Sequence, residues 1–554
     1  MLLSLTRLLP ALLLAPAGLA GTIFVDANLS TGLNDGSSWA NALQGSLGLQ
    51  DAMLLAVAGD EIFTAEGTYV PTTGTSRITS FRMINNVGIY GGFLGTETSP
   101  DQRPAFGAAP SVLTADTNGN GSISDNSYHV IRGFNTNSTA ILDGFVVRDG
   151  FANSGSSNND RGGGILLTNS SPTIRNCHFI DNRCTFGGGA GYINNASPNF
   201  TDCIFEDNIG GSFGGAFDIA TAGNVRFDRC QFLGNSASRA GGLEIFSTSG
   251  VVVSNSLFQG NTSTGSGGGG GLWIGSGGST QVINCTIVAN NATANTVGGL
   301  LRSGSSVLVR NTILWDNAGP GGAQNSANQI SSGTSVTYSI VEGGFTGTGN
   351  LGSDPTFNNS VGGDFSLGTG SPAIDAGNNA SVPGTISLDL AGNNRFDDVA
   401  SVPDTGAGSS PIVDIGAFEV QGSIGVVDTS CPPLANSTGF PASLAANGSL
   451  VVSHNQLQLN AVQLPTSQFG YFVMSRTTAN VPVGSGRLCL GAPLYRFNTH
   501  VLNSGASGTM GFTPDLTQLP QGQVFLPGES WSFQLWFRDG TTSNFTNGIG
   551  FTWQ

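Results

Sequence analysis

The chain has 554 residues, a formal net charge of −16 and only 10% charged residues, whereas glycine occupies 84 positions. This length allows several domains with substantial cores. All 19 basic residues are arginines, and the absence of lysine excludes Schiff-base chemistry and a Walker A phosphate loop. Because neutralising phosphates requires clustered cations, the acidic balance also argues against nucleic acid as a partner.

The first 20 residues predict a secretory signal peptide. They contain one positive charge at Arg7, an apolar stretch over Leu8–Leu14 and small residues up to Ala20. This segment is too short to span a membrane, and no later stretch approaches about 18 uninterrupted apolar residues. We therefore expect a secreted, extracellular protein, with or without attachment to the cell surface, and no transmembrane segment after signal removal.

The region after the signal peptide predicts a helix followed by a strand and a turn. Leu47–Val57 has helical spacing and ends before Gly59, and Glu61–Tyr69 has the pattern of a strand and a turn. If the following residues form a stack of strands, its open end would expose an apolar interior and a strand edge. We expect the helix to cap that end.

The segment that begins at Asp116 resembles the first part of an EF-hand or dockerin calcium loop. Oxygen-bearing side chains occupy alternate positions at Asp116, Asn118 and Asn120, then come a glycine and an aliphatic residue in the expected order, and Asp125 follows. The position that normally carries a bidentate acid is Ser127. Two interpretations remain, a calcium loop or a simple Asx/Gly turn. Calcium is the only cofactor that the sequence indicates.

A repeat of about 27 residues occupies the middle of the chain. Each copy has an apolar residue, two polar residues, then Cys, Ser or Thr, a large apolar residue and a final asparagine, and glycine pairs separate the copies. Successive final asparagines lie 26, 27, 26, 29 and 27 residues apart. This period, with strand-type alternation inside each copy, predicts stacked strands rather than helix pairs. The copies are Ile174–Asn182, Phe200–Asn208, Phe227–Asn235, Val253–Asn261, Val282–Asn290 and Val309–Asn317.

We expect each copy to form one turn of a parallel coil, with equivalent residues about 4.8 Å apart in adjacent turns. The two apolar columns should point inwards and the polar residues between them outwards. In particular, Phe179, Phe205 and Phe232 should lie above one another inside the coil.

The asparagine column is the most uniform part of the repeat. Asparagine tolerates a left-handed backbone at a tight corner, and its amide can bond to equivalent amides along the coil. We therefore expect a structural role for this column rather than a catalytic one. Its members are Asn182, Asn208, Asn235, Asn261, Asn290 and Asn317.

These features resemble right-handed parallel β-helix proteins of the pectin-lyase-like type. The glycine-pair motif together with F-x-x-N, as in Phe179–Asn182, also resembles polymorphic outer membrane protein repeats. The resemblance covers about Thr22–Glu342 and implies an all-β, right-handed parallel β-helix. It does not choose among the polysaccharide lyases, hydrolases, epimerases and adhesins that share this fold.

The seven cysteines fall into different contexts. Four of them occupy the Cys/Ser/Thr column of the repeat, where buried thiols are expected to pack in a narrow interior. Cys431 and Cys489 lie together in a separate C-terminal region, and we expect a disulfide between them in an exported protein. The four column cysteines are Cys177, Cys203, Cys230 and Cys285.

Two further regions follow the repeats. Asn350–Glu419 contains LGSDPTF, DFSLGTGSPAIDAG, DLAGNNRFDD and VDIGAFE, a series that resembles the choice-of-anchor Q domain of bacterial surface proteins and implies a location rather than a chemistry. Cys431–Gln554 has alternating runs that predict a separate all-β module of the β-sandwich type. The expected domains are residues 1–20 as signal peptide, 21–349 as β-helix with its N-terminal cap, 350–422 as a region closing the β-helix, and 423–554 as the C-terminal module.

Acidic residues on the coil offer one candidate catalytic group. Asp181 and Asp207 precede two ladder asparagines and should stack on adjacent turns, near the separation of about 5–5.5 Å that retaining glycosidases use. Arg175, from the same turns, could bind an acidic sugar or act as the base of a lyase, with Phe151–Arg161 as a lid. The alternative is a solvated face of ordinary paired charges.

A second candidate is the outward position after each glycine pair. If they are exposed there, Phe217 and Trp273 could stack on sugar rings or contact a partner.

Two functions are therefore compatible with the sequence. The first is a structural or adhesive protein that binds an extracellular polysaccharide or a cell-surface component through its stacked-strand face, with no catalytic residue. The second is an extracellular polysaccharide lyase or glycosidase that uses Asp181, Asp207 and Arg175. The uniform repeats, the low charge and the anchor-associated region favour the first.

Overall fold

The computed structural model describes residues 20–553, apart from residues 156–157, 249, 295–296, 305, 321–324, 400, 423–426, 429–430, 449, 451, 453–456 and 527. The predicted signal peptide lies outside the described residues except for Ala20. The chain forms two compact units. The first comprises Met1–Gln281, Ile287–Val307 and Asp316–Thr334, and the second comprises Val282–Thr286, Leu308–Trp315 and Ser335–Gln554.

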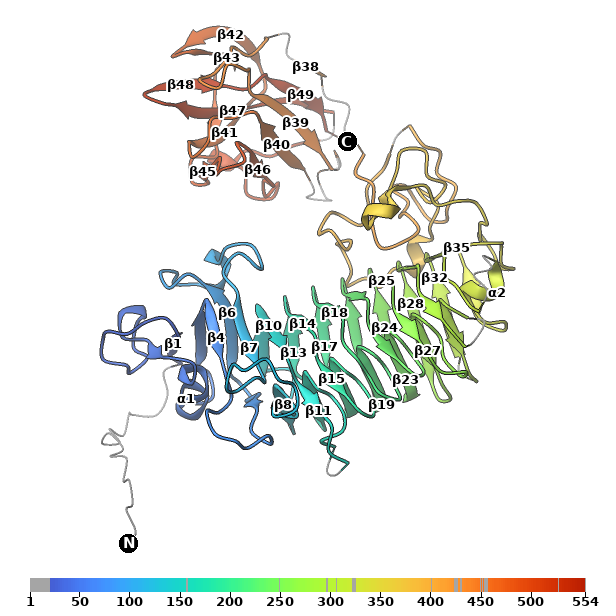
Figure 1. Cartoon of the computed structure of the whole chain (residues 1–554). Coiled ribbons are helices and arrows are strands. Elements are labelled where there is room, and N and C mark those ends of the chain that lie inside the picture. Colours follow the sequence, from blue (N-terminus) through green and yellow to red (C-terminus); the bar gives the residue numbers. More distant parts are fainter. Residues whose placement is uncertain are drawn as a thin grey trace. The chain divides into compact units, whose positions relative to one another are not determined.

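The first unit is a coil of parallel strands, in which successive turns contribute to three long sheets (Figure 1). In this unit the first sheet has the order β2-β1-β3-β6-β9-β13-β17-β20-β24, the second β25-β21-β18-β14-β10-β7-β4, and the third β31-β27-β23-β19-β16-β12-β8-β5. Each strand pairs in parallel with its equivalent from the next turn, as Ile174 does with Phe200. The prediction of an all-β parallel β-helix is confirmed.

The strands of the three sheets are short, as a coil with a narrow interior requires. The first sheet contains β1 (Thr22–Asp26), β2 (Leu43–Gln44), β3 (Glu61–Ala65), β6 (Gly88–Phe93), β9 (Ile141–Asp143), β13 (Thr173–Arg175), β17 (Asn199–Thr201), β20 (Arg226–Asp228) and β24 (Val251–Ser254). The second contains β4 (Gly67–Tyr69), β7 (Ser111–Thr114), β10 (Phe145–Arg148), β14 (His178–Ile180), β18 (Ile204–Glu206), β21 (Gln231–Leu233) and β25 (Leu257–Gln259). The third contains β5 (Phe81–Arg82), β8 (Ile131–Phe134), β12 (Ile165–Thr168), β16 (Gly191–Ala196), β19 (Phe217–Ala222), β23 (Leu243–Thr248), β27 (Leu272–Ile274) and β31 (Leu300–Arg302).

Short ladders and helices complete this unit. The helix α1 packs against β1, β2 and β3 at the N-terminal end of the coil, where the sequence predicts a cap (Figure 1). Among the described helices, none combines the length and apolar composition needed to cross a bilayer. The helices and short strands of this unit outside the three long sheets are α1 (Gly48–Leu55), α2 (Ser326–Gln329), η1 (Trp39–Asn41), η2 (Pro100–Gln102), β11 (Phe151–Ala152), β15 (Arg183–Cys184), β22 (Ser236–Ala237), β26 (Thr262–Ser263) and β30 (Asn291–Ala292).

The interior of the coil is filled by stacked apolar columns. Phe179 pairs with Phe205, and Phe205 with Phe232, and all three are fully buried. Their ring centroids lie 5.5 Å and 5.0 Å apart. Each ring covers the ring in the next turn, so contacts between adjacent turns remove the apolar surface from water.

A ladder of side-chain amides runs beside these columns. Each of the first five asparagines donates from Nδ2 to the Oδ1 of its counterpart in the next turn, at 2.8–3.1 Å. All six also donate to a main-chain carbonyl of the preceding turn. The last member, Asn317, donates to Oε1 of Gln329 at 2.7 Å. All six asparagines are fully buried, so these bonds satisfy groups that would otherwise be costly.

The left-handed corner residue is not the asparagine itself but the residue before it. Asp181 and Asp207 have φ values of 56° and 52°, and Gly234 has a φ of 63°. Aspartate and glycine tolerate this conformation better than other residues. The expectation that asparagine provides the left-handed geometry is therefore wrong, although the asparagines do occupy the corner.

The Cys/Ser/Thr column also lies inside the coil. Cys177, Cys203 and Cys230 are fully buried free thiols, and the main-chain N–H of Cys230 donates to Oγ of Ser256 in the next turn at 3.0 Å. A small side chain with a weak donor therefore suffices at this position.

The second unit begins with strands that continue the repeat. Val309 pairs with Val336, and Ile313 with Ile340, again in parallel. The strands β28, β29 and β32 are divided between the two units. These elements are β28 (Ser279–Ile283), β29 (Thr286–Val288), β32 (Ser306–Arg310), β33 (Ile313–Trp315), β34 (Ser335–Thr337) and β35 (Ile340–Val341).

The region that follows, up to residue 422, is largely irregular and packs on these strands. Asn311 exchanges hydrogen bonds with the main chain of Asn378 at 2.8 Å and 3.1 Å, and the N–H of Ala417 donates to Oγ1 of Thr286 at 3.0 Å. Ile313 belongs to the same buried apolar cluster as residues of this region. Its short elements are β36 (Phe357–Asn359), η3 (Ser360–Gly362), β37 (Asp364–Leu367) and η4 (Asn379–Ser381).

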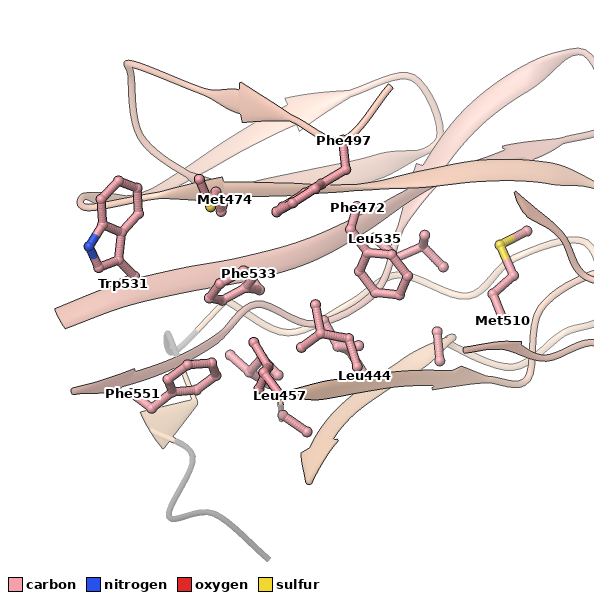
Figure 2. Close-up of a cluster of buried hydrophobic side chains, with 14 of the residues drawn as sticks. Leu444, Leu457, Phe472, Met474, Phe497, Met510, Trp531, Phe533, Leu535 and Phe551 are labelled. Atoms are coloured by element: carbon pink, nitrogen blue, oxygen red, sulfur yellow. The ribbon is translucent and has the colours of Figure 1, made fainter. Parts of the chain in front are cut away.

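The C-terminal module is a separate antiparallel β structure. Buried side chains from a seven-stranded sheet, such as Phe533 and Leu535, share one core with Leu444 and Leu459 of a three-stranded sheet (Figure 2). Its elements are β38 (Val427–Asp428), β39 (Ser443–Asn447), β40 (Gln458–Val462), β41 (Phe469–Ser475), β42 (Thr478–Val483), β43 (Gly486–Leu490), β44 (Tyr495–Arg496), β45 (Leu502–Asn503), β46 (Met510–Phe512), η6 (Pro520–Gly522), β47 (Ser530–Asp539), β48 (Thr542–Phe545) and β49 (Ile549–Thr552).

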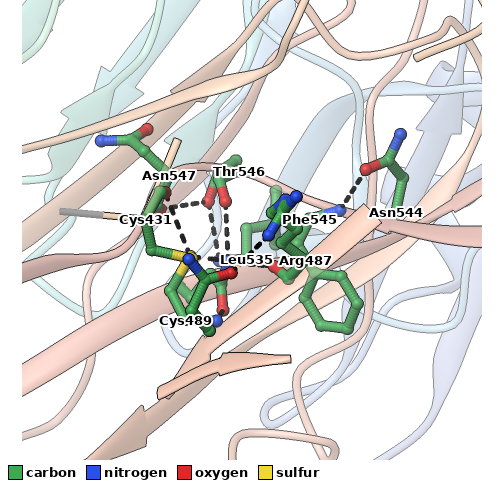
Figure 3. Close-up of a disulfide and its surroundings, with 10 residues drawn as sticks. Cys431, Arg487, Cys489, Leu535, Asn544, Phe545, Thr546 and Asn547 are labelled. Carbon is green, nitrogen blue, oxygen red and sulfur yellow. Dashed lines mark hydrogen bonds between the residues drawn. A yellow bond between two sulfur atoms is a disulfide. The ribbon is translucent and has the colours of Figure 1, made fainter. Parts of the chain in front are cut away.

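A disulfide joins Cys431 and Cys489, the pair expected from the sequence (Figure 3). Both cysteines are buried, and the N–H of Cys489 donates to Oε1 of Gln534 at 2.9 Å. The bridge ties the start of the module to β43, which reduces the conformational freedom of the unfolded chain.

Candidate functional site

The outward-facing residues of the third sheet form a continuous row across the turns of the first unit. Strand pairing sets each member opposite the next, so neighbouring backbones lie about 4.8 Å apart along the row. We call this set the outer row. Its members are Arg132, Leu166, Tyr192, Asp218, Glu244, Trp273 and Leu301.

Phe217, which the sequence pattern placed in this row, lies inside the coil. It is fully buried, and its ring centroid is 4.9 Å from those of Phe200 and Phe205. Asp218 is the residue that faces outwards, opposite Glu244. The prediction that Phe217 is exposed is therefore wrong.

One extra residue explains the error. Ala216 stands between Gly215 and Phe217, whereas Leu243 follows Gly242 directly. Strand pairing nevertheless sets Phe217 opposite Leu243, so an alignment on the glycine pairs is displaced by one position here. Since side chains alternate between the two faces of a strand, this displacement exchanges an inward residue for an outward one. The sequence signal that could have revealed this error was the large apolar side chain of Phe217 at a position assigned to the outside.

Trp273 does belong to the outer row, but it is only 7% exposed. The guanidinium of Arg239 lies 4.0 Å from its ring centroid, and the ring of Phe246 is stacked at 6.2 Å. Phe246 is 43% exposed. The prediction that Trp273 itself is exposed is wrong, and Phe246 supplies the accessible aromatic surface in this place.

Two buried acids are adjacent in the outer row. Asp218 is 4% exposed and Glu244 is fully buried. The carboxylate of Glu244 accepts a hydrogen bond from Nε of Arg239 at 2.9 Å within an ion pair. Burial and then the charge of Glu244 raise the pKa of Asp218 to about 8, whereas Arg161 and Arg239 oppose the rise. Near neutral pH, Asp218 therefore holds a proton beside an ion-paired Glu244.

Arg161 connects a loop to the outer row. Its Nη1 donates to the hydroxyl of Tyr192 at 2.7 Å, and its guanidinium lies 4.1 Å from the ring centroid of Phe186. Such cation–π contacts order a guanidinium over aromatic faces. Arg161 is also the last residue of Phe151–Arg161, the segment that the sequence suggested as a lid, so its end contacts this row.

A cavity of about 540 Å³ lies at the Arg132 end of the outer row. Among the described residues, no acidic residue lines it, and neither Arg82 nor Arg132 forms a salt bridge. Burial and then the charge of Arg82 lower the pKa of Arg132. Phe134, 66% exposed, adds an aromatic face. The lining residues are Arg82, Met83, Arg132, Gly133, Phe134, Asn158, Leu166 and Thr168.

Arg175 lies elsewhere, on the first sheet. It donates from Nε to Oδ2 of Asp143 at 2.7 Å, and Asp143 also pairs with Arg103 at 3.1 Å. A smaller cavity of about 190 Å³ includes Arg103 in its lining. Because the buried Asp143 pairs with both arginines and offsets one of their two positive charges, this part of the surface offers less to an anion than the cavity at Arg132.

Asp181 and Asp207 follow strands of the second sheet, so the structure does not gather them with Arg175. Burial, followed by Glu206 and Asp181, raises the pKa of Asp207. Their positive φ values account for aspartate at these positions through backbone conformation. Nε2 of His178 on β14 lies 2.9 Å from Oε2 of Glu206 on the neighbouring strand β18.

The loop around Asp116 satisfies its own oxygen atoms. Asp116 accepts the N–H groups of Gly119 and Gly121, both at 2.9 Å, while the side-chain amides of Asn118 and Asn120 donate to Asp125 at 2.7 Å and 2.9 Å. These hydrogen bonds lower the pKa of Asp125. The loop is thus held as a series of Asx turns, and its acceptors are directed to its own N–H groups rather than to a shared centre.

The family model described as "Right handed beta helix region" matches residues 114–287 and 215–380. A crystal structure of pectate lyase Pel9A has a TM-score of 0.41 and 14% identity, over 73% of this chain and 97% of that one. A tailspike protein 2 domain of bacteriophage CBA120 has a TM-score of 0.24 and 12% identity, over 91% of this chain and 76% of that one. No curated protein matches the chain in sequence. The family model agrees with the right-handed parallel β-helix.

Proposed function

We propose that this protein binds an acidic polysaccharide along the outer row, with the cavity at Arg132 as the site for an anionic group. The cavity is the observation that carries the proposal. In a chain with 35 acidic and 19 basic residues, it brings two arginines together without an acidic partner in its lining. Guanidinium groups bind carboxylates and sulfates through paired hydrogen bonds.

The surroundings of the cavity suit a sugar chain rather than a lone anion. Phe134 lies in the cavity lining and Phe246 lies near Trp273 further along the row, and both have exposed rings that can stack on sugar faces. Tyr192, between them in the row, is only 3% exposed and accepts a hydrogen bond from Arg161, so it supports the surface from below. A ligand that spans several turns would reach both exposed rings, since successive turns add about 4.8 Å.

The proposal extends to the location of the protein outside the cell. The predicted signal peptide, the Cys431–Cys489 disulfide and the resemblance of Asn350–Glu419 to choice-of-anchor Q domains support export and surface attachment. The resemblance of the repeats to polymorphic outer membrane protein repeats supports the same location.

Binding measurements with defined polysaccharides test the proposal. The full chain is titrated with polygalacturonate and with neutral dextran at low and moderate salt. We expect binding of the acidic polymer only, weakened at least about 10-fold by Arg82→Gln together with Arg132→Gln, and weakened by salt. The matched control is Arg226→Gln, an exposed arginine of the first sheet, which should bind like the wild type. Equal affinity of wild type and double variant would disprove the proposed site.

Hydrolysis of the bound polysaccharide is a second candidate function, favoured by the Asp218–Glu244 pair. Asp218 has a raised pKa and its neighbour Glu244 is ion-paired with Arg239, and glycosidases use two carboxyl groups as a general acid and a second carboxylate. Asp218 would be the acid, because it is the group that holds a proton near neutral pH. Release of reducing ends that is lost in Asp218→Asn, with binding retained, would establish this activity. Binding without any release would leave the protein as an adhesin.

A further inference from the structure

The region between β37 and residue 422 contains an unusual number of buried acidic side chains. Asp375, Asp389, Asp397, Asp414 and Glu419 are all no more than 4% exposed. Arg395 is the fully buried cation among them, and its Nε lies 3.6 Å from Oε2 of Glu419. One arginine cannot compensate the charge of so many buried carboxylates, so the other acids require hydrogen-bond donors or another cation.

Backbone N–H groups serve four of these five acids. Asp389 accepts from Asn393 and Glu419, at 2.7 Å and 2.9 Å. Asp414 accepts from Asp375 and Val420, at 2.8 Å and 2.7 Å. The remaining two are served in the same way, Asp397 by the N–H of Gly422 and Glu419 by the N–H groups of Asp397 and Asp414.

Asp375 is different. Its side chain is fully buried, yet neither Oδ1 nor Oδ2 accepts a hydrogen bond from a described residue. One carboxylate oxygen of Asp375, one of Asp398 and one of Asp404 all lie within 4.8 Å of one another. Asp398 and Asp404 are exposed, so this group of three opens to solvent. The buried carboxylate therefore faces two other carboxylates and accepts no hydrogen bond from a described residue.

Without a cation this arrangement is unfavourable. Three carboxylates converge within a few ångströms, and the buried one accepts no hydrogen bond from a described residue, so their like charges repel one another.

We propose that Asp375, Asp398 and Asp404 bind a calcium ion. Carboxylate oxygens are hard ligands that suit calcium and magnesium rather than softer metals. Two oxygens on one calcium, each about 2.4 Å from the ion, can be up to about 4.8 Å apart, and the three oxygens of this group lie within that limit. Magnesium requires oxygens at about 2.1 Å in a strict octahedron and tolerates a smaller spread. Water completes the coordination on the open side.

The site would fasten a region that has little regular structure. Asp375 follows Ile374, a member of the buried cluster that includes Ile313 of β33. Asp398 and Asp404 lie in a loop of the irregular region. An ion shared by these residues holds that loop against the last turns of the second unit's strands. This role is independent of the polysaccharide site, which lies in the first unit.

Isothermal titration of the full chain, stripped with a chelator, tests the site with calcium chloride and magnesium chloride. We expect calcium to bind and to raise the melting temperature, with magnesium weaker by at least about 10-fold. Asp398→Asn with Asp404→Asn should weaken calcium binding at least about 10-fold. Because both side chains are exposed, this double variant should fold, and circular dichroism checks that it does.

Two further variants decide the location. Asp116→Asn with Asp125→Asn removes the carboxylates of the EF-hand-like loop and should leave calcium binding unchanged. Asp375→Asn should abolish binding and make the melting temperature insensitive to calcium. Absence of calcium binding to the wild type, or binding that the Asp398/Asp404 variant retains, would overturn the proposal. Binding lost in the Asp116/Asp125 variant would overturn it as well.

Discussion

The coil and the irregular region at residues 364–422 bury polar side chains in opposite ways. In the coil, the asparagine ladder repeats one neutral group, and each amide donates to the next and accepts from the previous one. In the irregular region, the buried polar groups are mainly carboxylates, which accept but cannot donate when ionised. Amides can therefore stack upon themselves without limit, whereas each carboxylate needs a separate donor or a cation.

This difference explains the forms of the two regions. A self-complementary side chain lets the backbone repeat, so the coil can be extended turn by turn. Carboxylates require the main chain to bring N–H groups to each of them, so the backbone of the irregular region follows the acids. The four acids that receive N–H groups fit this description, and Asp375 is the exception that points to an ion.

The largest effect is expected from removing the buried cation of the irregular region. Arg395→Met leaves Glu419 and Asp414 without their nearest positive charge and should reduce the free energy of unfolding by about 3–5 kcal/mol. Chemical denaturation followed by circular dichroism measures this. The control is Arg476→Met, which removes a partly exposed ion pair with Glu529 and should cost less than about 1 kcal/mol. Similar losses in both variants would mean that the carboxylates do not depend on Arg395.

The next effect is a break in the amide ladder. Asn235→Leu removes the acceptor for Asn208 and the donor to Asn261, leaving buried groups unsatisfied on both sides. We expect a loss of about 1–3 kcal/mol in the free energy of unfolding. Asn199→Leu, at an exposed position of β17, should change stability by no more than about 0.5 kcal/mol. An unchanged melting curve for Asn235→Leu would remove the ladder from the explanation of the coil.

The next prediction concerns the ionisation of Asp218, a buried carboxyl group in the outer row of the regular coil. Its folded pKa of about 8 exceeds the unfolded value of about 3.9, so its stabilising protonated form is complete at low pH and is lost as pH rises towards 8. The free energy of unfolding of the wild type should therefore fall relative to that of Asp218→Asn as pH rises from about 4 to about 8, and the difference should stay level above about pH 8.

Asp51→Asn, an exposed change on α1, is the control for that pH series and should follow the wild type at each pH. A difference between wild type and Asp218→Asn that stays constant with pH would show that Asp218 is ionised throughout, so it could not serve as the acid of the second candidate function.

The smallest effect is expected in the Cys/Ser/Thr column. The structure already uses Ser256 where Cys230 and Cys203 stand in earlier turns, with Oγ of Ser256 donating to the carbonyl of Ser254 at 2.6 Å. Cys203→Ser should therefore cost less than about 1 kcal/mol, whereas Cys203→Leu should cost about 1–3 kcal/mol because no space is left for a larger side chain. If both substitutions cost the same by thermal melting, the column is not limited by volume.

The sequence allowed the coil to be predicted because its interior repeats. The spacing of Phe179, Phe205 and Phe232 reported the turn length directly, and the asparagines repeated at the same period. The prediction failed at Ala216, where a single residue alters the register. Because of this shift, the sequence pattern placed Phe217 rather than Asp218 in the outer row. It failed again for Trp273, because its burial depends on contacts with Arg239 and with Phe246 of β23, which no column of the repeat reveals.

Most residues of the candidate site could therefore be identified only from the structure. Arg82, Arg132 and Arg161 lie outside the regular copies, so no column of the repeat marked them, and only the stacking of turns places them beside the third sheet. The same holds for Asp375, Asp398 and Asp404, which are scattered over about 30 residues of irregular chain.

Local pattern by itself determined the coil, its period, the identity of its inward columns and the disulfide pair, because each depends on residues that recur or stand apart in the chain. Tertiary structure alone decided which charges meet, since the distance between two side chains on different turns depends on a register that one inserted residue can shift. Ion pairs form over a few ångströms, so this register separates Arg175, which pairs with Asp143, from the cavity arginines, which form no salt bridge with a described residue.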